Sequence, residues 1–129
     1  MINNSNFDLY IDEGTDFAVY LLLEDVNIDS NGVETIVPVD LTGVSSVTAQ
    51  VRARFNDTTP LITFSAAITS ALGGEIALSL TATQTQNIET IQSIPTVHIG
   101  YYDVIINKMS GAKTKLVGGK VWLNQTVTR

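Results

Sequence analysis

Between residues 45 and 55, apolar and polar side chains alternate with a period of two residues. This pattern indicates a half-buried β-strand, because successive side chains on a strand point to opposite faces of the sheet. One face would carry Val47, Ala49, Val51, Ala53 and Phe55, and the other Thr48, Gln50, Arg52 and Arg54. A chain built around such a segment must place a sheet against its core.

Further strands are predicted from similar segments that are separated by turn residues. They cover residues 7–11, 17–24, 61–66, 75–80, 97–107 and 115–127. Residues 17–24 are more continuously apolar than the others, so we expect a central strand that is covered on both faces. Residues 25–32 are rich in Asn and Asp and are expected to form a loop, and residues 108–113 a hairpin loop.

Two features interrupt the strands. Gly118 and Gly119 are expected to form a bulge or bend, since glycine inside a strand often marks irregular backbone. Residues 82–93 lose the alternation, and a short helical crossover between two sheets is expected there. Seven or eight strands at short, regular spacing predict an all-β fold, an antiparallel β-sandwich or a small barrel. With 129 residues and no cysteine, one core can hold a single domain, residues 1–129, with residues 1–6 as a flexible N-terminal arm.

Charge excludes several classes of partner. The chain has 7 Lys and Arg residues against 13 Asp and Glu, a formal net charge of −6. Phosphate groups are bound by clustered Lys and Arg, so neither a nucleic acid nor a membrane is expected as a partner. Charged residues make up only 16% of the chain and hydrophobic residues 44%, which favours a surface partly covered by neighbouring subunits. Residues 1–6 lack the features of a signal peptide, so we expect synthesis in the cytoplasm without secretion.

Reactive side chains are scarce in the sequence. The one histidine, His98, lies in a predicted strand, and we interpret it as a strand or interface residue rather than a general base. The sequence has no glycine-rich phosphate loop, no Gly-x-Ser-x-Gly and no His-Glu-x-x-His motif. Most carboxylates fall in predicted turns or on exposed strand faces. The two catalytic carboxylates of a glycosidase must lie on either side of a substrate cleft, which these positions do not provide. We therefore expect no catalytic residues, no cofactor and no small-molecule substrate.

One segment has the composition of a metal loop. Residues 27–32 resemble the opening of a calcium loop, with oxygen-bearing side chains at alternate positions followed by Gly32. The closing bidentate glutamate of such a loop would fall at Pro38, which has no side-chain ligand. We therefore interpret the segment as an Asx-rich hairpin loop and expect no metal ligands.

Asp103 is the most unusual carboxylate, because it lies in the middle of a predicted strand, where acidic residues are disfavoured. Either it forms a structural ion pair with Arg52 or Arg54, or it points to water. Large aromatic side chains with a polar tip suit both a core and an interface. We predict three core or interface anchors, which are Phe7, Tyr102 and Trp122.

Eight short segments follow one another in an order that is known from a protein family. They read GTDF at 14–17, VDLTG at 39–43, QVR at 50–52, TPLITF at 59–64, GEIALSL at 74–80, YDV at 102–104, LVGGKV at 116–121 and VTR at 127–129. Together they resemble a family of small tailed-bacteriophage proteins with an immunoglobulin-like β-sandwich, often found among tail and baseplate genes. The resemblance implies an immunoglobulin-like fold and supplies no catalytic residues. The chain departs from the family at Gly100. Members of the family often have a Gly-x-Tyr-x-Tyr-Asp run here, and Gly100 stands in place of its first tyrosine. The resemblance therefore does not imply a tyrosine-corner contact at this strand.

The resemblance and the composition together lead to one main hypothesis. The chain is expected to be a non-enzymatic structural or adaptor protein of a tailed-phage virion, in the tail, baseplate or neck. It would bind other virion proteins and copies of itself, as trimers, hexamers or their multiples, through strand edges and loops. The alternatives are a capsid decoration protein and a carbohydrate-binding host-attachment module, which needs an exposed aromatic platform although only 7% of the residues are aromatic. A two-carboxylate hydrolase involving Asp103 ranks last.

Overall fold

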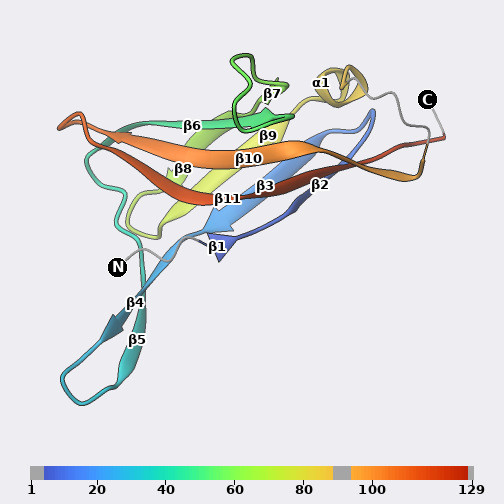
Figure 1. Ribbon diagram of the computed structural model, residues 1–129. Helices are drawn as coiled ribbons and strands as arrows, with labels where there is room; N and C mark the ends of the chain where they lie inside the picture. Colours follow the sequence, from blue (N-terminus) through green and yellow to red (C-terminus); the bar gives the residue numbers. More distant parts are fainter. Residues whose placement is uncertain (1–4, 89–93, 128–129) are drawn as a thin grey trace.

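Two β-sheets packed face to face form the body of the molecule, and a separate hairpin projects from it (Figure 1). The structure is a computed structural model and describes residues 5–88 and 94–127. The larger sheet contains β1 (Ser5–Asn6), β2 (Leu9–Asp12), β6 (Val44–Arg52), β7 (Ile62–Thr63), β10 (Thr96–Lys108) and β11 (Lys113–Asn124). The smaller sheet contains β3 (Phe17–Leu22), β8 (Ser65–Ser70) and β9 (Glu75–Leu80). The hairpin consists of β4 (Glu24–Ile28) and β5 (Glu34–Pro38), and the short helix α1 (Ala82–Gln86) follows β9.

The strand order joins distant parts of the sequence. The larger sheet has the order β1-β11-β10-β6-β7, and β2 also pairs with β11. β1 and β2 run parallel to β11, whereas the other pairs of this sheet are antiparallel. The smaller sheet has the order β3-β9-β8 with antiparallel pairs. The predicted all-β sandwich is therefore confirmed, with more strands in the described residues than the seven or eight expected, since short edge strands and the hairpin add to the count.

The alternating segments bury the faces that their pattern predicts. On β9, Ile76, Leu78 and Leu80 are buried, and on β6 Ala49 and Val51 are buried. These side chains belong to one hydrophobic cluster that both sheets share. Full burial of such a side chain contributes about 1.5–3 kcal/mol, so the space between the sheets is the main source of stability.

The pattern of β6 does not continue to residue 55 as predicted. The strand ends at Arg52 because the next residues form a tight turn, in which the Asp57 backbone N–H donates to the Arg54 carbonyl and Asp57 Oδ2 accepts from the Arg54 N–H. Ala53 and Phe55 were expected on the buried face, and both are exposed. The prediction was wrong there because periodicity does not show where a strand stops.

β3 was predicted as a central strand covered on both faces, and this prediction was wrong. Among the described strands β3 pairs with β9 alone, so it forms an edge of the smaller sheet. Its inward side chain Leu21 is buried, whereas Tyr20 and Leu22 are 64% and 66% exposed. Apolar residues on both faces of this strand thus reflect one core face and one uncovered face.

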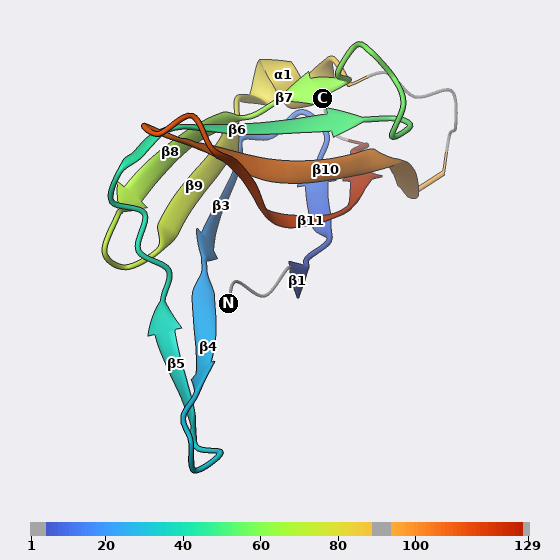
Figure 2. The ribbon, with the colours of Figure 1, turned by 60° about the vertical axis from the view of Figure 1, so that its left-hand side comes forward.

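Residues 25–32 were predicted as a loop, and all of them belong to the projecting hairpin, which we define as residues 24–38. The prediction was wrong for residues 25–28, which belong to strand β4. Its tip turns at Gly32, whose φ of 78° suits a residue without Cβ. At its base the Val39 N–H donates to the Leu23 carbonyl and the Leu23 N–H to the Gly74 carbonyl, both at 2.9 Å. Within the described residues β4 and β5 pair only with each other, and the hairpin extends away from the sandwich (Figure 2).

Gly118 and Gly119 do not form the expected bulge. They pair regularly with β10, and the register shift of β11 lies at Leu116 instead. The two glycines allow close approach of backbone: a Cβ on Gly119 would lie 2.5 Å from the Phe7 carbonyl oxygen, and one on Gly118 3.0 Å from that of Tyr102. They therefore make room for the N-terminal segment beside β11.

The helical crossover is present over residues 82–86, and the rest of its predicted range at 89–93 lies outside the described residues. Thr81 caps α1 with a capping box that includes the Gln84 side chain. Of the expected flexible arm at residues 1–6, Ser5 and Asn6 form β1, and residues 1–4 lie outside the described part. In the described chain no helix is long and apolar enough to cross a membrane.

Candidate interaction surfaces

Five ring side chains lie in a continuous row across the outer face of the larger sheet, and we call them the aromatic row. The ring centroids of Tyr10 and Trp122 are 6.4 Å apart, and those of Trp122 and His98 are 5.0 Å apart. The row continues from His98 to Tyr101 at 5.0 Å and from Tyr101 to Phe55 at 4.6 Å. Phe55 is 78% and Tyr10 58% exposed. The outer face of the sheet is therefore partly apolar where it meets solvent.

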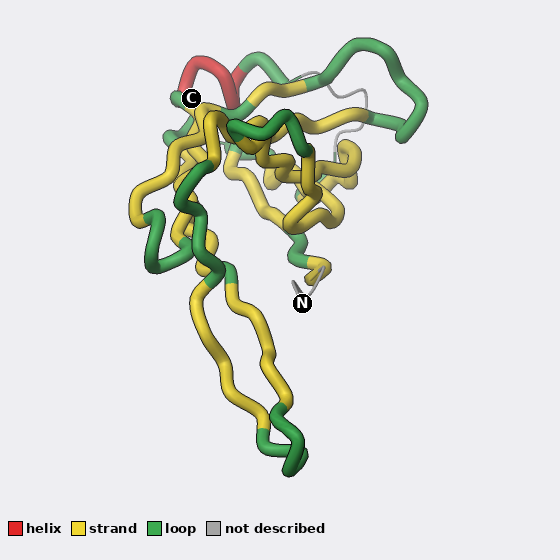
Figure 3. Tube along the Cα trace, turned by 90° about the vertical axis from the view of Figure 1, so that its left-hand side faces the viewer, coloured by secondary structure: helices red, strands yellow, loops and turns green. Residues whose placement is uncertain are grey.

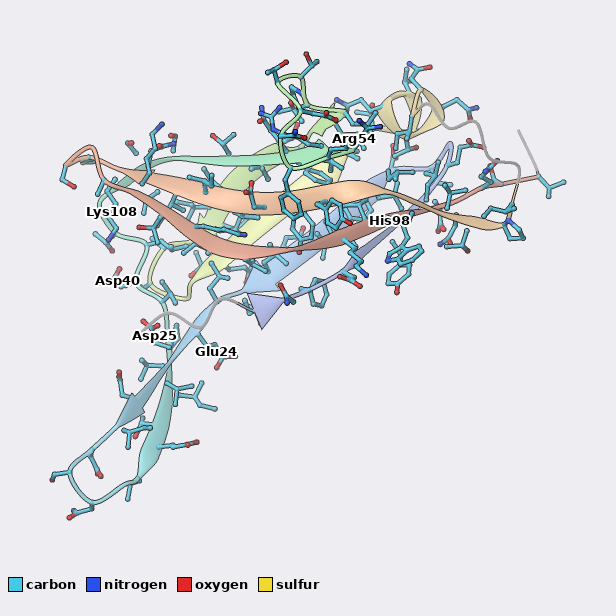
Figure 4. The ribbon with its side chains drawn as sticks, viewed as in Figure 1. Glu24, Asp25, Asp40, Arg54, His98 and Lys108 are labelled. Atoms are coloured by element: carbon cyan, nitrogen blue, oxygen red, sulfur yellow. The ribbon has the colours of Figure 1, made fainter. Side chains whose placement is uncertain are left out.

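A bulge in β10 makes this row possible. Residues three apart on a regular strand point to opposite faces, so His98 and Tyr101 should not meet. The register of β10 against β11 shifts between His98 and Gly100, which inserts one extra residue at Ile99. Both rings consequently lie on the outer face, whereas Ile99 is buried. His98, which is labelled in Figure 4, is thus an exposed strand residue. Its ring contacts those of Tyr101 and Trp122.

A shallow hollow of about 430 Å³ adjoins the Phe55 end of the row. Tyr101 and Phe55 form one side of it, and Asp8, Lys115 and Lys120 supply charged groups. Ligand pockets commonly have a volume of this order and combine aromatic walls with a few polar groups. The aromatic row and the hollow together could hold a ligand or a partner side chain against the sheet.

Of the two interpretations left open for Asp103, the ion pair with Arg52 or Arg54 is not present among the described residues. In the register of the sheet Asp103 lies opposite Gln50, and Arg52 lies opposite Tyr101. The Arg52 guanidinium donates instead to the Asp57 carbonyl at 3.1 Å and to Gln50 Oε1 at 3.0 Å. Arg54 follows the end of the strand and is exposed. The loop after β6 therefore engages Arg52, and Asp103 lies half-buried on the outer face.

The three predicted anchors have different environments. Tyr102 is 3% exposed and lies in the core, where its hydroxyl donates to the Phe7 carbonyl. The Phe7 ring is 49% exposed, so its backbone rather than its ring holds the N-terminal segment to the sheet. Trp122 is half-buried in the aromatic row, and its indole N–H is enclosed without an acceptor in the part of the chain described. Burial raises the pKa of Tyr102 above its ordinary value, and the nearby Asp8 carboxylate adds to this.

We expect Tyr102→Phe to change how stability depends on alkaline pH. The folded pKa of Tyr102 is raised above the unfolded value of about 10, so its stabilising contribution is complete below pH ~10 and is lost as the pH rises further. The variant should lose about 1 kcal/mol at pH 8 with the hydrogen bond, and should lose less additional stability between pH 9.5 and 11 than the wild type. Urea unfolding across this range measures both effects. Parallel pH profiles of the two proteins would contradict the prediction.

The segment that resembles a calcium loop forms the tip of the projecting hairpin. Asp29 Oδ1 accepts hydrogen bonds from the backbone N–H groups of Asn31 and Val33, at 2.8 and 2.9 Å. This is the Asx-type turn that the sequence favoured, and the carboxylate supports the turn itself. Across residues 5–88 and 94–127, no three His, Cys, Asp or Glu side chains are grouped closely enough to hold a metal ion.

The projecting hairpin is the second exposed surface. Ile28, Val33 and Ile36 are 65%, 56% and 63% exposed, so the hairpin carries apolar side chains that the sandwich does not cover. Seen end-on, its two strands stand clear of the sheets (Figure 3). An isolated two-stranded hairpin is only marginally stable in water. A partner that packs on it would stabilise its conformation and would bury its apolar side chains.

No protein-family model matches the chain, and no curated protein is significantly similar to it. The fold defines the molecule as an all-β sandwich protein with two exposed surfaces. These surfaces are the aromatic row and the projecting hairpin.

Proposed function

We propose that the chain is a non-enzymatic structural or adaptor protein of a tailed-phage virion, placed in the tail, baseplate or neck. It acts by binding other virion proteins and copies of itself, and it is assembled into the particle after synthesis in the host cytoplasm. The observation that carries this proposal is the projecting hairpin, with its exposed Ile28, Val33 and Ile36 and its two unpaired strand edges. Free backbone N–H and C=O groups on a strand edge bind another strand readily, and the apolar side chains add contact area.

In this proposal the sandwich is of the immunoglobulin type. That fold places its second, fifth and fourth strands in one sheet and its third, sixth and seventh strands in the other. The order β3-β9-β8 corresponds to the first set and β6-β10-β11 to the second, if the projecting hairpin and the short strand β7 are left out of the count and β1 and β2 are taken together as the first strand. The first strand departs from the constant-type arrangement, because β1 and β2 pair with β11 in the larger sheet. The agreement of both sheets supports the immunoglobulin-like assignment, and with it the resemblance to phage tail and baseplate proteins.

Mass spectrometry of purified virions tests the proposed role. The protein is expected among the particle proteins, and labelling for electron microscopy should place it on the tail, baseplate or neck. Its absence from intact particles would refute the proposal. A label distributed over the capsid shell would instead support the alternative function of a capsid decoration protein.

The aromatic row favours a second candidate function, a carbohydrate-binding module for host attachment. Sugar rings present C–H groups that pack on aromatic side chains, and Asn124 and Asp12, which share a hydrogen bond of 3.0 Å, supply polar groups beside Trp122. A glycan array with the wild type and Trp122→Ala distinguishes this candidate. Glycan binding by the wild type that Trp122→Ala loses would support this function, whereas a wild-type protein that binds no glycan on the array would exclude it.

A further inference from the structure

The charges of this chain are segregated along the sequence. All 7 Lys and Arg residues lie at or after position 52, whereas 9 of the 13 Asp and Glu residues precede it. The fold converts this separation into two surfaces of opposite sign. Residues 24–38 of the projecting hairpin include four acidic residues and no basic one, while the turn between β10 and β11 is flanked by Lys108, Lys113 and Lys115.

Both surfaces lie at the same end of the sandwich. The Met109 N–H donates to the Gly43 carbonyl at 2.9 Å, which joins the lysine-bearing turn to the segment that leaves the hairpin. Figure 4 shows Lys108, Asp40, Asp25 and Glu24 in succession from the turn to the hairpin. A two-fold axis at this end would therefore bring each surface of one copy to the opposite surface of another.

The groups on both surfaces are accessible. Glu24 and Glu34 on the hairpin are exposed, and so are the three lysines. Among the described residues no ion pair is present between these two glutamates and these lysines. The apolar parts also match, because Met109 at the turn is 78% exposed and can pack against Ile28 or Ile36. Each hairpin strand has five residues and reaches about 17 Å, enough to extend over a neighbouring turn.

From this charge complementarity we propose that the projecting hairpin of one copy docks on the β10–β11 turn of a second copy, reciprocally, so that two copies form a two-fold pair. Glu24 and Glu34 face Lys108 and Lys113, and the exposed apolar side chains of both surfaces form the centre of the contact. The inference rests on the proposed structural role and names the partner and the surface of one of its contacts. Opposite charges set the partner and its register, and apolar burial supplies the affinity.

Charge reversal in the full-length protein tests the pairing by sedimentation velocity at several concentrations. One variant carries Glu24→Lys and Glu34→Lys, and the other Lys108→Glu and Lys113→Glu. Each alone should self-associate at least about tenfold more weakly than the wild type, because like charges then face each other. An equimolar mixture should recover the pair, since both contacts of a mixed dimer again join opposite charges. Arg54→Glu, an exposed basic residue at the other end of β6, is the control and should associate like the wild type.

Two results would overturn the inference. One is a wild-type protein that stays monomeric at millimolar concentration, and the other is charge-reversed variants that associate as tightly as the wild type or fail to recover when mixed. Circular dichroism of each variant checks that the sandwich is intact. Failure here would leave binding to other virion proteins untouched, whereas absence from purified virions would refute the proposed role even if two copies pair.

Discussion

Leu78→Ala is expected to lower the free energy of unfolding by about 4 kcal/mol. Leu78 is 0% exposed and lies on β9, the central strand of the smaller sheet, between Val19 and Ala66 of the neighbouring strands. Truncation removes contacts with the larger sheet and leaves a cavity that fixed strands on both sides cannot fill. Small domains are stable by only about 5–15 kcal/mol, so this loss would remove a large part of the total.

Leu22→Ala supplies the matched control, because it removes the same atoms from the same sheet. Leu22 is 66% exposed at the end of β3, and its truncation should change stability by less than about 0.5 kcal/mol. Urea unfolding monitored by circular dichroism measures both variants. If the dependence of the unfolding free energy on urea concentration is unchanged, the shift of the transition midpoint reports the loss of stability. Equal losses from both positions would mean that the Leu78 side chain is not packed between the two sheets.

The second large effect is expected at Gly100. A Cβ at this position would collide with the carbonyl group of Arg52 and approach the Cα of Ala53, and backbone atoms cannot rotate away as a side chain does. Gly100→Ala must therefore push β10 and β6 apart where they meet, at a cost of about 3 kcal/mol.

Gly73→Ala is the control for this variant. The added methyl group meets only the Ser70 side chain, whose hydroxyl can move, so the loss should stay below about 1 kcal/mol. Gly100→Ala should in addition separate the rings of His98 and Tyr101, because the bulge that brings them together begins at Gly100. Chemical denaturation and the histidine NMR resonances report both consequences. Wild-type stability with unshifted resonances would contradict the prediction.

The sequence predicted strands well where one face is buried and the other is not. β9 and the long strand β10 follow their alternation closely, because period two reports a surface that is covered on one side. The same signal failed for β3, whose outward residues are as apolar as its inward ones. It also failed for the projecting hairpin, where neither face is buried and the strands leave no one-sided pattern.

The two candidate surfaces were harder to predict, for separate reasons. The aromatic row depends on the bulge at Ile99, which places His98 and Tyr101 on one face although their spacing assigns them to opposite faces. The sequence left two interpretations of Asp103 open, an ion pair or a side chain that points to water, because cross-strand neighbours depend on the register of the sheet, and this register places Arg52 opposite Tyr101. The local signal for the hairpin was the Asx-rich segment 27–32, which was correctly interpreted as a hairpin loop, but the strands on either side of it were not predicted.

The chain segments that enter and leave the projecting hairpin are hydrogen-bonded to each other at its base, so the hairpin sequence can vary independently of the sandwich. Leu23, Val39 and Gly74 join through backbone hydrogen bonds directly below it, so the fold is already complete without residues 24–38. Insertions, deletions and exchanges of sequence within residues 24–38 are therefore expected to leave the sandwich core unchanged. Sequence changes in this segment can therefore alter the exposed surface of the molecule, whereas the stability of the body depends on residues elsewhere in the chain.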